Sequence, residues 1–309
     1  MGENSSTKWP LRVKAFGAAF CLSASLCLCP PSTPGLQRVV SDTPRQTTRT
    51  LLGVRLGAEV SSWLDEVEKR LGEEVYAEFA ELDEAGAAAD YTLGVSYLTG
   101  TGVGVVRVDE SFRARGAKQT EAVIGHELLH LRLRARGYPL FLFSPEVMTV
   151  KGRAEDVEQS NVNDLVSLIE HRIFAEEMRR TGFDKLIDLT NWLESARGKR
   201  RSDEGQAVTI NYARAALEWD DPRLLDELTR IYRAKGWERS LSDGRRLADV
   251  IRASNIKAPG EVAPVFLGCM SVLYRADFSV EADRRFALSR TYPQMLIHAR
   301  RPARRRGVR

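Results

Sequence analysis

The chain has 309 residues, of which 43% are hydrophobic and 28% are charged. This length can bury a large core, and the composition is that of an ordinary globular protein, which excludes a fibrous or largely disordered chain. The formal net charge is +4, but the last ten residues alone contain six arginines and no acidic residue. The body of the protein is therefore near neutral, and nucleic acid is not an expected partner.

The N-terminus departs from globular composition. Lys8, Arg12 and Lys14 precede residues 15–29, which are uncharged and mostly apolar. A cationic start followed by such a run is typical of a signal peptide or a short anchor, and the run is shorter than the ~20 apolar residues of a membrane-spanning helix. Residues 1–29 are thus predicted to be a signal-like or anchor segment. This favours export or membrane association over the alternative, a cytoplasmic protein.

The first half of the body shows alternating strand and helix signals. Residues 30–50 are rich in Pro, Ser and Thr and predict a linker, so the folded body is expected to begin near Leu51. Residues 61–72 predict a helix with Trp63 and Val67 on one face. Residues 74–82 predict a strand, and residues 90–112 predict two more strands around a glycine turn.

From residue 119 onward the periodicity becomes helical. Residues 119–137 predict one helix, which Gly137 and Pro139 end, and residues 162–182 predict a second, which Gly182 ends. The remainder up to residue 299 shows several further helical segments and few strand signals. Residues 300–309 form an Arg-rich tail, for which a solvated chain end is the expected structure.

The first of these helices carries the pattern H-E-x-x-H, as HELLH at residues 126–130. His126 and His130 are four residues apart, so on a helix both rings lie on one face and can bind one metal ion. Glu127 between them is placed to accept a proton from a metal-bound water. Apolar neighbours surround the three polar residues, which makes unpaired imidazoles costly. A helix whose histidines are simply hydrogen-bonded is the alternative.

A catalytic zinc site usually has three protein ligands, so one more is needed. No third histidine follows the motif directly. Three of the four cysteines lie within residues 1–29, and Cys269 stands in no recognisable ligand pattern. Glu170, flanked by apolar residues on the second helix, is the predicted third ligand, and His171 is the first alternative. Other nearby acids remain weaker candidates: Glu155, Glu158, Glu176 and Glu177.

With Glu170 as a ligand, His171 would lie beside the metal and donate a hydrogen bond to an oxyanion, which makes it a candidate catalytic residue together with Glu127. A helix-surface histidine is the alternative for His171. His298 is remote in sequence and is expected to be structural.

The HELLH helix followed by Glu170 on a later helix resembles the zincin metallopeptidases, specifically their gluzincin branch. The resemblance covers roughly residues 51–190 and implies an α+β, zincin-like metal domain with a small antiparallel or mixed sheet and active-site helices. A mainly helical C-terminal region, residues 191–299, would follow. In that family an edge strand binds extended peptide substrate, and residues 102–111 are expected to be the matching strand.

The resemblance implies a zinc-dependent metallopeptidase. His126, His130 and Glu170 would hold one Zn²⁺ per chain, and Glu127 would act as general base on a peptide or protein substrate. One alternative is a catalytically inactive zinc-binding protein whose helical C-terminal region binds a protein partner. Another is nucleic-acid binding through the Arg-rich tail.

Overall fold

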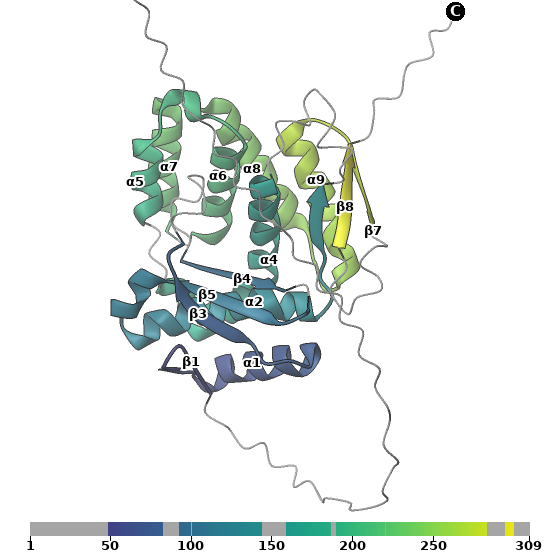
Figure 1. Cartoon of the computed structure of the whole chain (residues 1–309). Coiled ribbons are helices and arrows are strands. Elements are labelled where there is room, and N and C mark those ends of the chain that lie inside the picture. Colours follow the sequence, from purple (N-terminus) through teal and green to yellow (C-terminus); the bar gives the residue numbers. More distant parts are fainter. Residues whose placement is uncertain are drawn as a thin grey trace, which may run out of the picture. The chain divides into compact units, whose positions relative to one another are not determined.

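The structure is a computed structural model that describes residues 49–82, 93–99, 101–143, 159–186, 190–219, 221–282 and 294–299 (Figure 1). The signal-like segment, most of the predicted linker and the Arg-rich tail lie outside these described residues. Residues Gln46–Arg309 belong to one compact unit. The described part of this unit has an α+β architecture with small sheets, and none of its helices has the length and apolarity that crossing a membrane requires.

A three-stranded sheet and two helices form the N-terminal part of the unit (Figure 1). The elements are β1 (Thr50–Leu51), β2 (Val54–Arg55), α1 (Ala58–Leu71), β3 (Tyr76–Ala80), β4 (Gly94–Leu98), β5 (Gly104–Asp109) and α2 (Ala117–Ala135). The sheet order is β3-β5-β4, with β3 parallel and β4 antiparallel to β5. Both α1 and α2 pack against this sheet, where Val106 and Val108 of β5 are fully buried.

The sequence patterns of this part are largely confirmed. The predicted helix at 61–72 is α1, although it begins earlier, and the predicted strand at 74–82 is β3. The glycine turn joins β4 and β5 into an antiparallel hairpin, and Gly102 adopts the positive φ of 90° that such a turn requires. The predicted helix at 119–137 is α2, and Gly137 follows it with a φ of 87°.

The predicted edge strand is wrong. Residues 102–111 contain β5, which lies in the middle of the sheet, and β4 is the strand at the edge beside α2. The reason is visible in the side chains: Val105, Val106 and Val108 are all buried, as in a strand with neighbours on both sides, whereas the burial of β4 alternates.

A second sheet joins the two halves of the chain. It has the order β6-β8-β7, formed by β6 (Leu140–Phe143), β7 (Phe278–Ala282) and β8 (Gln294–Ala299). β8 is parallel to β6 and antiparallel to β7. The expectation of a mainly helical region after residue 190 therefore missed two strands, β7 and β8, of which β8 pairs with the sequence-distant β6.

The remaining described helices are α4 (Gln159–Thr181), α5 (Thr190–Gly198), α6 (Gln206–Glu218), α7 (Pro222–Ala234), α8 (Glu238–Ala253) and α9 (Val262–Tyr274). Of these, α6, α8 and α9 pack against α4, whereas α5 packs against α7, and α7 packs against α6 and α8. One hydrophobic core includes Leu64 of α1, Leu128 of α2, Leu168 of α4 and Phe266 of α9, so residues before and after 190 share it. Cys269 of α9 is a buried free thiol in this core.

An ion-pair network joins α1 to α2. The Glu66 carboxylate accepts hydrogen bonds from Arg132 Nε at 2.7 Å and from Arg136 Nε at 2.8 Å. Burial alone would raise the pKa of Glu66, but the bonds from these two arginines outweigh it and lower the pKa to about 2. The network therefore anchors the C-terminal turn of α2, the helix that carries HELLH, to α1.

Replacing Glu66 by Gln should give a pH-dependent loss of stability. Because its folded pKa lies below the ordinary value, the ion pairs contribute fully above about pH 4.5, and their contribution is lost as the pH falls towards 2. We expect the variant to lose about 1 kcal/mol of unfolding free energy at pH 7 and less at pH 3, measured by urea denaturation. Glu73→Gln, at an exposed position just after α1, is the control. Equal losses of unfolding free energy at pH 7 and pH 3 would contradict a stabilising role of ionised Glu66.

Candidate metal centre

Helix α2 presents two imidazoles on one face. His126 and His130 are separated by one helical turn, and the rest of the helix is buried on most sides through residues such as Ile124, Leu128 and Leu129. The two imidazole side chains remain 18% and 13% exposed. The helix is thus held by its apolar residues while the ring pair faces α4.

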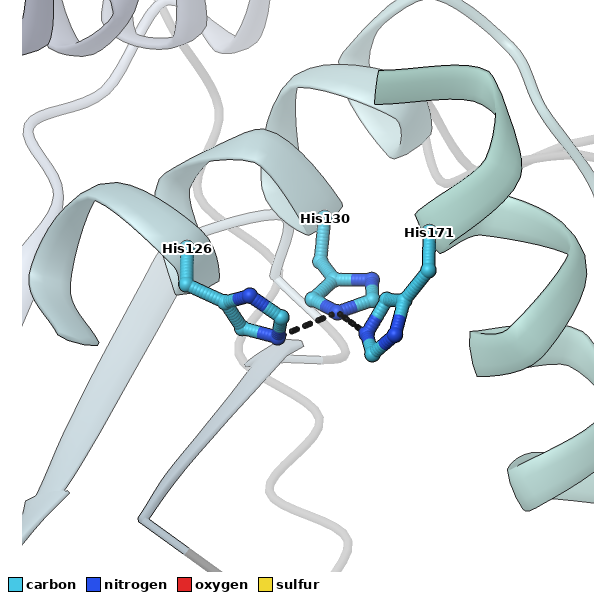
Figure 2. Close-up of side chains that lie close together, drawn as sticks. All are labelled: His126, His130 and His171. Carbon is cyan, nitrogen blue, oxygen red and sulfur yellow. Dashed lines mark hydrogen bonds between the residues drawn. The ribbon is translucent and has the colours of Figure 1, made fainter. Parts of the chain in front are cut away.

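Helix α4 brings a third imidazole to this pair (Figure 2). His130 Nε2 lies 3.2 Å from His126 Nε2 and 3.2 Å from His171 Nε2. Ligand nitrogens of the three rings all lie within 4.8 Å of one another. Figure 2 shows the rings pointing toward one another from two helices. The three histidines could therefore hold a metal ion.

Two carboxylates orient these rings from behind. His130 Nδ1 lies 2.7 Å from Glu170 Oε2, and His171 Nδ1 lies 2.7 Å from Glu218 Oε1 of α6. When each Nδ1–H donates to its carboxylate, the Nε2 atoms of both rings are unprotonated, and their lone pairs face each other at 3.2 Å. Opposed lone pairs repel, and either a proton or a metal cation between the nitrogens removes the repulsion. The donor set therefore fits a metal ion with carboxylate-oriented imidazole ligands.

The environment favours the neutral forms of His126 and His171. Burial, reinforced by the neighbouring imidazoles and by Arg214, lowers the pKa of His126 and of His171 well below the ordinary value. The Phe174 ring packs against all three imidazoles, with centroid distances of 5.0 to 5.6 Å. Neutral imidazole is the metal-binding form, so the apolar surroundings favour ligation over protonation.

Glu170, the predicted third ligand, lies on the far side of His130 from the cluster. Its carboxylate contacts Nδ1 of that ring and forms an ion pair with Arg134 of α2. Burial would raise the pKa of Glu170, but Arg134 and His130 outweigh it and the pKa is lowered, so the group is ionised. The structure thus brings His171, the alternative candidate, to the cluster and places Glu170 behind the His130 ring.

Glu127 is buried beside the cluster. Its Oε1 lies 3.9 Å from His126 Nε2, and its carboxylate accepts a hydrogen bond from Ser96 of the edge strand β4. Gly94 of β4 makes room for it, since a Cβ there would lie 2.9 Å from Glu127 Cγ. Burial raises the pKa of Glu127, with the Ser96 bond acting against it. A carboxyl of raised pKa is suited to accepting and returning a proton.

The cluster opens into a cleft with a volume of about 1200 Å³, which β4, α2, α4, α5 and α6 line. This is large enough for a segment of peptide or a small organic ligand. His298 does not belong to the site: it lies on β8, 3.1 Å from Glu281 of β7.

Several residues of the site carry no local sequence signal. Glu218 sits in a helix without a motif and meets His171 from 47 positions away. Arg134 and Gly94 carry no such signal either, because a glycine in a strand or an arginine in a helix is common in any chain. Only the approach of β4 and α6 to α2 and α4 gives these residues their roles.

Comparison of the chain with models of protein families, with curated proteins and with solved structures found no match. The support for the candidate metal centre is therefore its own geometry.

Metal content should distinguish His171 from Glu170 as the third ligand. We expect His171→Ala to lose most bound zinc, whereas Glu170→Gln and Glu218→Gln should keep zinc with an affinity weakened about 10–100-fold, because they only orient ligands. Elemental mass spectrometry after dialysis and competition with a chelator measure both effects.

The matched control is Glu176→Gln, an exposed position on the same helix. The opposite result, with zinc lost in Glu170→Gln and retained in His171→Ala, would make Glu170 the ligand.

Proposed function

We propose that the protein is a zinc-dependent hydrolase of peptide bonds in which His126, His130 and His171 are the ligands. The observation that carries this proposal is the convergence of three imidazole nitrogens beside a buried carboxyl group, Glu127, on the wall of an open cleft. Three nitrogen ligands suit zinc and leave a fourth position for water or substrate, as catalytic zinc sites require.

The zincin resemblance supports this proposal through two elements. The helix α2 carries the H-E-x-x-H pattern, and the antiparallel strand β4 runs along the edge of the adjacent sheet. In this proposal His171 takes the place that the gluzincin pattern assigns to Glu170. The metal set then differs from that branch, while the motif helix and the general base are retained.

The chain's own residues would divide the chemistry as follows. Bound zinc would lower the pKa of a water molecule and polarise a substrate carbonyl. Glu127 accepts the proton of the attacking water and delivers it to the leaving amine, and its raised pKa suits both transfers. Glu170 and Glu218 hold the ligand rings, and Phe174 restricts water on one side of the cluster.

Strand β4 offers a binding edge for the substrate. Within the described residues, β4 is paired on one side with β5 and has no strand neighbour on the other. Val95 and Tyr97 of β4 line the cleft, and Ser96 between them forms a hydrogen bond with Glu127. An extended peptide adding to this edge would pass the metal centre with its backbone hydrogen-bonded to β4.

The alternative, an inactive zinc protein with a partner-binding helical region, has less support. Helix α6 of that region supplies Glu218 to the metal centre, so the C-terminal helices already contribute to the site.

Glu127→Gln should keep zinc and lose activity. The amide is isosteric but cannot accept the proton, so we expect hydrolysis to fall at least ~100-fold while metal content is unchanged. The substrates are denatured casein and a peptide library whose products are identified by mass spectrometry, and Glu176→Gln serves as the control.

Full activity of the Glu127→Gln variant would contradict the assignment of Glu127 as the general base. A zinc-loaded wild-type protein that cleaves neither substrate would favour the inactive zinc-binding alternative.

A further inference from the structure

A cation lines the cleft beside the three histidines. Arg214 of α6 is on the cleft wall, and its side chain is only 18% exposed. Its charge contributes to the low pKa values of both His126 and His171, so it lies near these two rings.

The surroundings fix the Arg214 guanidinium in place. Its Nη2 donates a hydrogen bond of 3.4 Å to the backbone carbonyl of Asp164 on α4, and its Cζ lies 5.5 Å from the ring centroid of Trp192 on α5. Contacts from two neighbouring helices thus already restrict the guanidinium. Ligand binding therefore costs little further side-chain entropy at Arg214.

This cation is incompletely paired. Arg214 Nε is buried and makes no hydrogen bond within the described part of the chain. Glu218 Oε1, the carboxylate oxygen that forms an ion pair with Arg214, is 3.8 Å from Nε and already contacts His171 Nδ1 at 2.7 Å. By contrast, Nε of Arg132 and Nε of Arg136 lie 2.7 and 2.8 Å from the carboxylate oxygens of Glu66. Nε itself is closed to solvent, so a ligand in the cleft would contact the part of the Arg214 side chain that stays exposed. A guanidinium without a close ion pair is costly to hold in such a site, and a ligand that pairs with it offsets this cost.

We propose that Arg214 binds a carboxylate of the substrate in the cleft beside the metal centre. This inference rests on the proposed function and gives it a substrate preference. Guanidinium and carboxylate are matched in geometry, and hydrogen bonds between ionised groups are about twice as strong as neutral ones. The carboxylate is either an acidic side chain or the C-terminus of a peptide, and the two share the same chemistry.

Four hydroxamates test this inference through binding, without the need for turnover. Each has a malonyl hydroxamate group that chelates zinc, coupled to Ala, Ala-amide, Asp-amide or Asn-amide. Calorimetry with the zinc-loaded full chain gives their dissociation constants at pH 7.5. We expect a carboxylate compound to bind about 10-fold or more tightly than its neutral partner. Preference for Ala over Ala-amide identifies a C-terminal carboxylate, and preference for Asp-amide over Asn-amide identifies an acidic side chain.

Equal affinity within both pairs would overturn the role of Arg214 and leave the metal centre standing. Absence of binding by all four compounds, and by acetohydroxamate, would instead contradict the proposed metal centre on which the inference rests.

Arg214→Gln should abolish the preference without changing zinc content or the affinity for acetohydroxamate. The matched control is Arg172→Gln, which removes the same charge from another residue that lines the cleft. Loss of the preference in the Arg172 variant alone would assign the carboxylate to that residue and overturn the inference. If Arg214→Gln releases zinc, Arg214→Lys takes its place, because lysine keeps the charge but not the planar donors. We expect Arg214→Lys to reduce the preference for the carboxylate compound several-fold. An unchanged preference would contradict the proposal.

Discussion

The structure depends on one electrostatic constraint: three buried imidazole nitrogens face one another, at 3.2 Å for the two closest pairs. When Nδ1–H of His130 and of His171 donates to its carboxylate, the Nε2 lone pairs of these two rings oppose each other and repel. A bound cation removes this repulsion, and Glu170 and Glu218 then hold the two rings through the nitrogens that face away from the cluster.

Helix α4 is the element through which this constraint reaches the rest of the fold. It contacts α2, α6, α8, α9 and β6, and its N-terminal half is buried on several sides. The same helix supplies a ring of the cluster, the carboxylate behind His130 and the aromatic side chain that covers the rings. Small rotations of α4 would therefore disturb the ligand, its hydrogen-bond partner and the apolar cover together.

The C-terminal half of the chain is part of this framework. Strand β8 pairs with β6 on one side and with β7 on the other, and the hydrophobic core continues from α1 and α2 into α9. Helix α6 then brings Glu218 and Arg214 to the cleft. The proposed hydrolase would thus use residues from both halves, with the general base on α2 and the substrate-binding cation on α6.

Local sequence determined the elements whose signals are short-range. The four-residue spacing of His126 and His130 places two rings on one helix face, and the glycine turn makes the β4–β5 hairpin, since helical periodicity and backbone sterics act over a few residues. Tertiary structure alone decided the rest. Neighbouring residues on a helix differ by about 100° in direction, so only the packing of α4 against α2 places His171 in the cluster and Glu170 behind it. The pairing of β6 with β8, the central position of β5 and the contact of Glu218 with His171 likewise join distant segments, whose burial and hydrogen bonding no local pattern encodes.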